Sequence, residues 1–151
     1  MRFSFIATAA AAVAVQAAPG VIEARDDAAA ATPAIPAPCV PTPGLDTVAL
    51  YDKVFAFQKA YLFDKNYNET FKYYSADFQN IWRRGTQSRD QYWATDNVQR
   101  WNGVVVFPTD ASFKDGKFHV AYDMGENRTG HAGDDFVWKD GCVVSQQQTS
   151  S

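Results

Sequence analysis

One strand-like segment near the end of the chain carries two adjacent carboxylic acids in an alternating pattern. Within residues 128–138, Ala132, Phe136 and Trp138 share one face by alternation, and Asp134 is in phase with them whereas Asp135 is not. Alternate residues of a strand share one face, so Asp134 is predicted to point toward an apolar core. Burial among aromatic rings raises the pKa of a carboxyl group and suits it to general acid or base catalysis. Asp134 is therefore the candidate catalytic acid or base. The alternative is a structural carboxylate, hydrogen-bonded to the backbone or to a tyrosine.

Aromatic residues, which make up 15% of the chain, could surround this acid. Tyr51 or Tyr122 is the candidate for orienting a substrate beside Asp134. The predicted ligand pocket is lined by Trp82, Trp93, Phe118 and Phe136. Such rings suit a planar apolar ligand, although aromatic side chains also dominate the core of a domain of this size.

Two histidines form a second candidate cluster. A hairpin near Glu126 would place His119 and His131 opposite or diagonal to one another, as a paired-histidine site requires. The alternation of apolar residues instead sends both to the polar face, toward solvent or a partner subunit. The histidines and cysteines lack the local spacing of a metal site, and no phosphate-binding loop, dinucleotide-binding glycine motif or Ser-His-Asp spacing is present. No cofactor and no metal is expected.

The N-terminal region predicts export. Residues 1–18 combine a basic start, an apolar run and small residues before a cleavage site, which is the layout of a secretory signal peptide. Residues 19–44 are rich in Ala and Pro and show no apolar periodicity, so they predict an extended linker. Residues 45–151 are expected to form one folded domain. The protein is therefore predicted to be secreted and extracellular.

Two kinds of covalent modification fit that destination. An oxidising secretory pathway favours a disulfide bond between Cys39 and Cys142, with two free buried thiols as the alternative. Asn68 and Asn127 each begin an Asn-x-Thr sequence, so both are predicted N-glycosylation sites, although such tripeptides also occur by chance.

The charge distribution limits the class of partner. The formal net charge is −3, and the basic residues are scattered except for the adjacent pair Arg83 and Arg84. This balance argues against nucleic acid or an anionic membrane surface as a partner. A small apolar molecule or a protein remains as the expected partner.

Periodicity and turn residues predict an α+β order of elements. A helix is expected from Asp46 to about Phe63, a short second helix to Tyr74, and an extended segment over Ala76–Arg83 that Gly85 ends. A capping box, Ser88–Gln91, opens a third helix carrying Tyr92, Trp93 and Val98. Four antiparallel strands follow at Val104–Pro108, Lys117–Asp123, Arg128–Trp138 and Cys142–Thr149.

This order, the extended segment before a capped helix and the final Asp-x-Phe-x-Trp-x-Asp-Gly-x-Val hairpin resemble the NTF2-like superfamily, and its SnoaL-like branch in particular. The resemblance covers about Asp46–Thr149. It implies a cone in which three N-terminal helices pack in a curved antiparallel sheet. Together with the predicted signal peptide and glycosylation sites, we expect a small secreted protein of the fungal type. Domains of this kind commonly pair through the convex face of the sheet, so a homodimer is also implied.

The resemblance leaves several functions open, because this fold hosts isomerases, cyclases, dehydratases and members that only bind. In the isomerases a protonated acid near the position of Asp134 helps to form an oxyanion hole. Their proton-abstracting Asp lies at the end of the first strand, where this chain has Asn80–Trp82. The leading hypothesis is therefore a domain that binds a small apolar ligand or a protein partner, without catalysis. The alternatives are a cofactor-independent isomerase, cyclase or dehydratase using acid-base catalysis, and a secreted effector.

Overall fold

A computed structural model describes residues 34–95 and 100–149 of the chain. The predicted signal peptide at residues 1–18 lies outside the described residues, as do the predicted linker up to residue 33 and Val98 of the predicted third helix. No helix within the described ranges is long and apolar enough to cross a membrane.

The first helix, α1 (Thr47–Gln58), begins where the side chain of Asp46 accepts a hydrogen bond from the backbone N–H of Ala49 at 3.0 Å. It continues directly into a π-helical segment, η1 (Lys59–Phe63), so the helical region ends at the predicted residue. Three consecutive residues of η1, Ala60–Leu62, are buried. A π-helical turn is wider than an α-helical one and is frequent at functional sites, which makes η1 a segment to inspect.

Two short helices follow the predicted caps. α2 (Tyr67–Phe71) is capped by Asn66 and ends earlier than expected, because Tyr74 already belongs to the first strand. α3 (Arg89–Trp93) opens with the predicted capping box, in which Ser88 and Gln91 each accept a hydrogen bond from the backbone N–H of the other.

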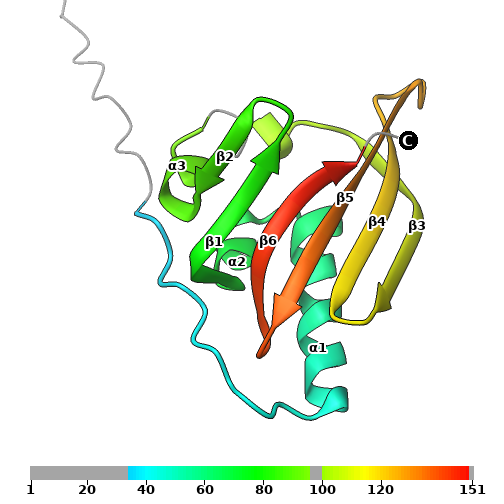
Figure 1. The fold of residues 1–151 in the computed structure, drawn as a ribbon. Coiled ribbons are helices and arrows are strands. Elements are labelled where there is room, and N and C mark those ends of the chain that lie inside the picture. The colour runs from blue at the N-terminus through cyan, green and yellow to red at the C-terminus, as the bar shows by residue number, and fades with distance from the viewer. Residues whose placement is uncertain (1–33, 96–99, 150–151) are drawn as a thin grey trace, which may run out of the picture. The chain divides into compact units, whose positions relative to one another are not determined.

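The described residues contain six strands in one sheet. These are β1 (Tyr74–Trp82), β2 (Gly85–Ser88), β3 (Val106–Lys114), β4 (Lys117–Met124), β5 (Gly130–Lys139) and β6 (Cys142–Thr149). Their order is β2-β1-β6-β5-β4-β3 (Figure 1). The four strands β3 to β6 pair antiparallel as predicted.

Two features of the sheet differ from the prediction. β1 pairs with β6 in parallel, so the sheet is mixed and the expectation of a wholly antiparallel sheet is wrong. The long connection between these strands lets the chain return to the same end of the sheet, which parallel pairing requires. β2 was not expected: Gly85 adopts φ +140, so the chain reverses there and pairs back on β1 instead of ending the strand.

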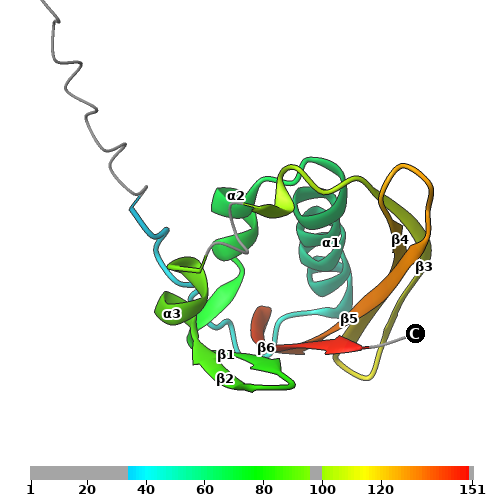
Figure 2. The ribbon, with the colours of Figure 1, turned by 90° about the horizontal axis from the view of Figure 1, so that it is seen from above.

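The sheet curves around α1, which lies across its concave side (Figure 2). α1 and α2 precede the sheet in the sequence, whereas α3 follows β1 and β2. Three N-terminal helices, as expected for the cone, are therefore not found within the described ranges. The predicted α+β fold, with a curved sheet that encloses helices, is confirmed.

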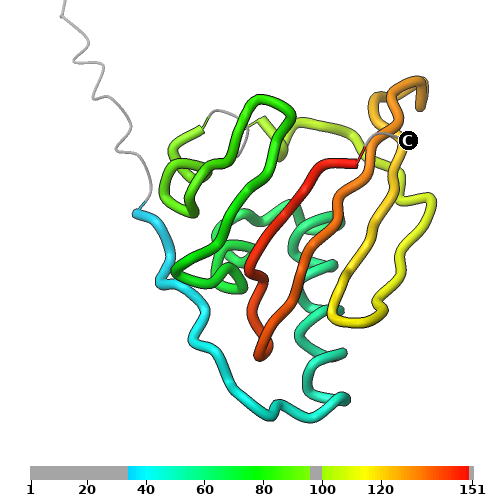
Figure 3. The backbone as a smooth tube through the Cα atoms, viewed as in Figure 1, coloured from blue at the N-terminus to red at the C-terminus, as the bar shows by residue number. Residues whose placement is uncertain are grey.

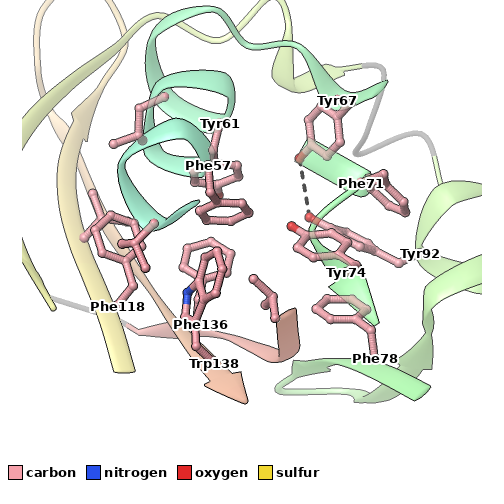
Figure 4. Close-up of a cluster of buried hydrophobic side chains, with 14 of the residues drawn as sticks. Phe57, Tyr61, Tyr67, Phe71, Tyr74, Phe78, Tyr92, Phe118, Phe136 and Trp138 are labelled. Carbon is pink, nitrogen blue, oxygen red and sulfur yellow. Dashed lines mark hydrogen bonds between the residues drawn. The ribbon is translucent and has the colours of Figure 1, made fainter. Parts of the chain in front are cut away.

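The core is built from aromatic side chains that the helical segments and the inner face of the sheet contribute (Figure 4). Phe57 of α1 is fully buried, and its ring centroid lies 4.8 Å from that of Phe136 and 5.4 Å from that of Trp138. On β5, Ala132, Asp134, Phe136 and Trp138 are buried, whereas His131 and Val137 are exposed. The predicted alternation of this strand is therefore correct.

The segment before α1 is attached to the sheet. Cys39 and Cys142 form the predicted disulfide, with Cα atoms 5.8 Å apart. The backbone N–H of Cys39 also donates to the carbonyl of Tyr74, the first residue of β1, at 2.9 Å. In Figure 3 the cyan tube that precedes the first helix is this segment. Contact begins before Cys39, because the buried guanidinium of Arg89 donates to the carbonyl of Pro36.

Candidate functional site

The carboxyl group of Asp134 lies in the interior and is surrounded by neutral hydrogen-bond donors. Only 3% of the residue is exposed. The hydroxyls of Tyr61 and Tyr122 donate to Oδ2 at 2.8 and 2.6 Å, and the amide of Gln146 donates to Oδ1 at 3.2 Å. Asp134 forms no ion pair with any described residue. Both oxygens of this acid are therefore occupied by protein donors.

Burial dominates the electrostatics of this cluster. Removal from water raises the pKa of Asp134, and the hydrogen bonds from Tyr122, Tyr61 and Gln146 oppose that rise only in part. Burial, reinforced by the charge of Asp134, also raises the pKa values of Tyr61 and Tyr122. The two tyrosines are therefore neutral donors over the physiological range of pH, and Asp134 is the group whose protonation can change.

The π-helical segment places Tyr61 against Asp134. The carbonyl oxygen of Tyr61 accepts a hydrogen bond from the indole Nε1 of Trp101 at 2.9 Å, and the two rings stack with centroids 5.0 Å apart. Trp101 also contacts the ring of Tyr122 edge-on, at 5.4 Å between centroids. The indole of Trp101 thus contacts both tyrosines that donate to Asp134.

A second layer of hydrogen bonds orients Gln146. The hydroxyl of Tyr74 donates to Oε1 of Gln146 at 3.1 Å, so the amide nitrogen of that side chain is turned toward Asp134. Beside this group, the hydroxyls of Tyr67 and Tyr92 lie 3.4 Å apart (Figure 4). Buried polar groups that are paired in this way fix side-chain positions, which gives the acid a defined geometry.

A cavity of about 270 Å³ opens onto this cluster. This volume lies just below the range of roughly 300 to 1,000 Å³ that is usual for small-molecule sites. Half of its twelve lining residues are aromatic, and the lining also contains Asp134, with Arg100 as its one cation among the described residues. The lining residues are Tyr61, Tyr67, Trp82, Tyr92, Arg100, Trp101, Val104, Tyr122, Met124, Asp134, Gln146 and Gln148.

Some residues predicted for the site from the sequence line this cavity and others do not. Trp82 and Tyr122 line it together with Asp134. Phe136 and Phe118 are instead buried in the core, with ring centroids 6.0 Å apart. Trp93 packs edge-on against Phe71, at 4.7 Å between centroids. Inward-facing residues of the sheet contribute both to the core and to the cavity. Alternation predicts that a residue faces inward, but it does not predict which of the two it joins.

Tyr51 lies away from the acid. Tyr51 belongs to α1 and is 51% exposed, and its ring contacts that of Phe113 of β3 with 5.4 Å between centroids. It lines a separate small cavity with Phe55 and Phe118, between α1 and the edge of the sheet. The assignment of Tyr51 to a site with Asp134 is therefore corrected: Tyr61, within the π-helical segment η1, occupies that place.

The end of β1, at Asn80–Trp82, carries no carboxylate. Asn80 is 1% exposed, and its Nδ2 donates to Oε1 of Gln87 on β2 at 3.1 Å. No carboxylate other than that of Asp134 lines the cavity within the described ranges. The site therefore offers one acid, with no second carboxylate to act as its partner.

The two histidines face away from this site and do not form a pair. His119 lies opposite Asp135 across β4 and β5, with 2.6 Å between Nδ1 and Oδ1. His131 lies opposite Asp123 in the same two strands, with 2.7 Å between the corresponding atoms. Each histidine is thus matched to an acid on the outer face of the sheet. The part of the chain that the structure describes holds no group of three or more potential metal ligands.

The sequence does not reveal Gln146 as part of the site. The pairing of β5 with β6 shifts between Val137 and Trp138, so that Val143 faces Trp138 and Ser145 faces Val137. The residue between them, Val144, is a bulge that reverses the alternation of β6. Because the sequence does not reveal the bulge, the alternation of residues along β6 cannot decide whether Gln146 or Gln147 points inward.

Comparisons with known proteins identify the fold but no family. No protein-family model and no curated protein matches the sequence. Among solved structures, a SnoaL-like protein of unknown function from Burkholderia thailandensis has a TM-score of 0.54 at 12% identity, over 71% of this chain and 98% of that one. An NTF2-like protein of unknown function from Cytophaga hutchinsonii has a TM-score of 0.50 at 15% identity, over 66% and 88%. A candidate polyketide cyclase from Sinorhizobium meliloti has a TM-score of 0.50 at 14% identity, over 70% and 100%. The chain therefore has the NTF2-like fold.

Proposed function

We propose that the cavity above Asp134 binds a small, planar, largely apolar molecule that carries a hydroxyl or carbonyl oxygen, and that it does so without catalysis. The observation that carries this proposal is the occupancy of the acid. Tyr61 and Tyr122 both donate to Oδ2 and Gln146 donates to Oδ1, so three of the roughly four acceptor positions of the carboxylate are already used by the protein and Oδ2 has none left to remove a proton from a ligand. A carboxylate that is already hydrogen-bonded, at the base of a cavity with aromatic walls, is better suited to binding a ligand than to reacting with it.

The walls of the cavity suit a flat ligand. The stacked rings of Tyr61 and Trp101 present apolar surface, and Tyr122 stands edge-on to the indole. Aromatic walls with a few fixed polar groups are the usual composition of a small-molecule site, and ring stacking adds about 0.5–1.5 kcal/mol beyond the burial of area. A ligand of one or two fused rings is the expected class.

The hydroxyl of Tyr122 is the proposed anchor for the polar group of the ligand. While Asp134 is ionised, the tyrosine proton is directed to the carboxylate, and the hydroxyl oxygen can accept a hydrogen bond from a ligand hydroxyl. When Asp134 is protonated, it can donate to that oxygen, which frees the tyrosine proton for a ligand carbonyl. The pair can thus match either kind of oxygen.

The test compares 2-naphthol with 2-methylnaphthalene, which have the same ring system and similar size, by isothermal titration calorimetry. We expect 2-naphthol to bind about tenfold more tightly, since one hydrogen bond in a buried site contributes about 1–1.5 kcal/mol. Tyr122→Phe should remove the difference, whereas Tyr51→Phe, on the outside of α1, should leave it unchanged. Equal affinity for both probes, or no binding of either, would contradict the proposal.

Acid-base catalysis is the second candidate function. It is favoured by the 2.6 Å hydrogen bond between Tyr122 and a carboxyl group whose pKa burial raises, because such a pair can hold and release a proton at the cavity. Proteins of this fold include one named as a candidate polyketide cyclase. A screen of polyketide-like ketones and enols for turnover tests this function. Turnover that Asp134→Asn abolishes would establish catalysis and displace the binding proposal.

We also propose that the protein is secreted, as a small extracellular protein of the fungal type with a signal peptide at residues 1–18 and a linker before the domain. The disulfide between Cys39 and Cys142 is compatible with this destination. Asn68 and Asn127 are both exposed, as N-glycosylation requires. Expression in a secretory eukaryotic host, with N-terminal sequencing and glycosidase digestion of the product, tests this. A product that stays in the cell with an intact N-terminus would contradict it.

A protein partner, as for a secreted effector, remains the third candidate. The outer face of the sheet, with its His119–Asp135 and His131–Asp123 pairs, is the surface proposed for such a partner or for a second copy of the chain. Sedimentation of the purified protein, with a charge-reversing substitution such as Asp135→Lys as the comparison, tests pairing of copies. A monomer at all concentrations would contradict the homodimer.

A further inference from the structure

A second and larger cavity adjoins the first at the end of the β1–β2 hairpin. Its volume is about 470 Å³. Trp82 at the end of β1 and Gln148 near the end of β6 line both cavities. The remaining lining residues are Arg83, Arg84, Gly85, Thr86 and Gln87. A ligand held in the first cavity therefore has this second space beside it.

The second cavity is lined by two cations, and no described residue of its lining carries a compensating negative charge. Arg83 and Arg84 are exposed, and neither forms a salt bridge with any described residue. None of the residues that line the cavity is acidic. The chain as a whole has a formal net charge of −3, so this adjacent pair of arginines runs against the overall charge. Arginine presents a planar set of donors that matches a carboxylate in two parallel hydrogen bonds.

Trp82 contributes to the walls of both cavities. Its indole Nε1 has less than 1 Å² of exposed surface, so the residue presents its ring carbons rather than its N–H to the two spaces. The basic groups of the second cavity are therefore those of Arg83 and Arg84.

We propose that the second cavity binds the carboxylate of the same ligand, so that the protein recognises an aromatic carboxylic acid rather than a neutral aromatic molecule. The aromatic body occupies the cavity above Asp134 and packs on the ring of Trp82, and the carboxylate lies between Arg83 and Arg84. This inference rests on the proposed binding function and adds the chemical class of the ligand. It also gives a role to the one basic cluster in the sequence, which the first cavity does not use.

The test compares 2-naphthoic acid with 2-naphthamide, which share shape and ring system but differ in charge at pH 7.5. Calorimetry on the full-length folded domain with its disulfide intact should show the acid binding about tenfold more tightly, and added salt should weaken the acid alone. The double variant Arg83→Gln, Arg84→Gln should reduce the affinity for the acid to that for the amide. Circular dichroism should confirm that the variant is folded, as expected for two exposed side chains.

The matched control is Lys114→Gln, Lys139→Gln. These lysines are exposed at the β3–β4 and β5–β6 turns, at the opposite end of the sheet from the β1–β2 turn (Figure 1). The control removes the same charge, so an effect of net charge alone would appear in both variants. The preference for the acid should persist in the control.

The outcomes separate the two proposals. Equal binding of acid and amide, or a preference that survives the arginine substitutions, would overturn the carboxylate site and leave the binding function standing. Loss of the preference in both double variants would also overturn it, since the effect would then be nonspecific. If neither probe binds, and 2-naphthol does not bind either, the binding function itself fails.

Discussion

Asp134 and Asp135 are neighbours in the sequence but lie in opposite environments. Asp134 is 3% exposed and accepts hydrogen bonds from two tyrosines and an amide, all neutral. The side chain of Asp135 is 22% exposed and lies against His119 and Lys117, at 2.6 and 3.4 Å. Two adjacent residues of β5 therefore differ in environment: Asp134 is buried among uncharged donors, whereas Asp135 lies at the surface beside basic side chains.

The difference shows what makes an acid on this strand a candidate for function. Strand alternation decides which acid is buried, and the partners decide what burial does to it. Desolvation raises the pKa of Asp134, and the hydrogen bonds from its neutral donors offset this rise only in part. Asp135 belongs to a surface pair of a kind that commonly contributes 1 kcal/mol or less, roughly, to stability. Four predictions test this contrast.

The largest effect is expected from removing each acid in turn. Asp134→Ala leaves three buried donors without an acceptor and opens a void, so it should lower the free energy of unfolding by about 3 kcal/mol or more. Asp135→Ala, its matched control on the same strand, should cost less than about 1 kcal/mol. Urea denaturation followed by circular dichroism measures both. Similar losses for the two variants would contradict the contrast.

Removing one donor from the buried acid should have an intermediate effect. Tyr122→Phe and Tyr61→Phe each delete a hydrogen bond to Asp134 and should each lower the free energy of unfolding by about 1.5 kcal/mol. Tyr51→Phe, whose ring is half exposed, should change it by less than about 0.5 kcal/mol. If the three tyrosine variants are indistinguishable in urea, the hydrogen bonds to Asp134 do not stabilise the fold as described.

The pH dependence of stability should carry the signature of Asp134. Its folded-state pKa is raised, so the folded protein holds the proton more tightly than the unfolded chain and unfolding releases it. Stability should therefore fall as the pH rises from the ordinary carboxyl value of about 3.9 toward the raised pKa, by up to about 1.4 kcal/mol per pH unit. Asp134→Asn should remove this slope, whereas Asp135→Asn should retain it. A wild-type slope that survives Asp134→Asn would assign it to another group.

The smallest effect is expected on the outer face. His119→Gln and Lys117→Gln remove the basic partners of Asp135 and should each change the free energy of unfolding by less than about 1 kcal/mol. Added salt should reduce the effect of Lys117→Gln further, because exposed charges are screened. A cost comparable to that of Tyr122→Phe would show that the outer pair is as important to the fold as the buried cluster.

Much of the fold could be predicted from the sequence because its signals are local. Asp46 and Ser88 mark helix starts by their capping chemistry, and both caps are present. Asp140–Gly141 predicts a tight hairpin, and both residues adopt positive φ. The burial of Asp134 follows from the period of a strand. Each of these depends on neighbouring residues only.

The remaining features depend on contacts between distant segments. The parallel pairing of β1 with β6 and the bulge at Val144 are set by the assembled sheet, so the inward position of Gln146 could not be read from its neighbours. The π-helical segment shifts the inward-facing residues to Ala60–Leu62, which brings Tyr61 rather than Tyr51 to the acid. Periodicity therefore identified the acid of the site but only one of its three hydrogen-bond donors, Tyr122.

The most direct test of the central claim is a carbon-13 NMR titration of the Asp134 side-chain carboxyl, with and without saturating 2-naphthol. A buried acid held by neutral donors at the base of a ligand cavity should titrate above the ordinary value of about 3.9, and the ligand should move its midpoint. The signal of Asp135, on the far face of β5, should not respond to the ligand. A midpoint for Asp134 at or below the ordinary value, or one that 2-naphthol leaves unchanged, would contradict the role assigned to this acid.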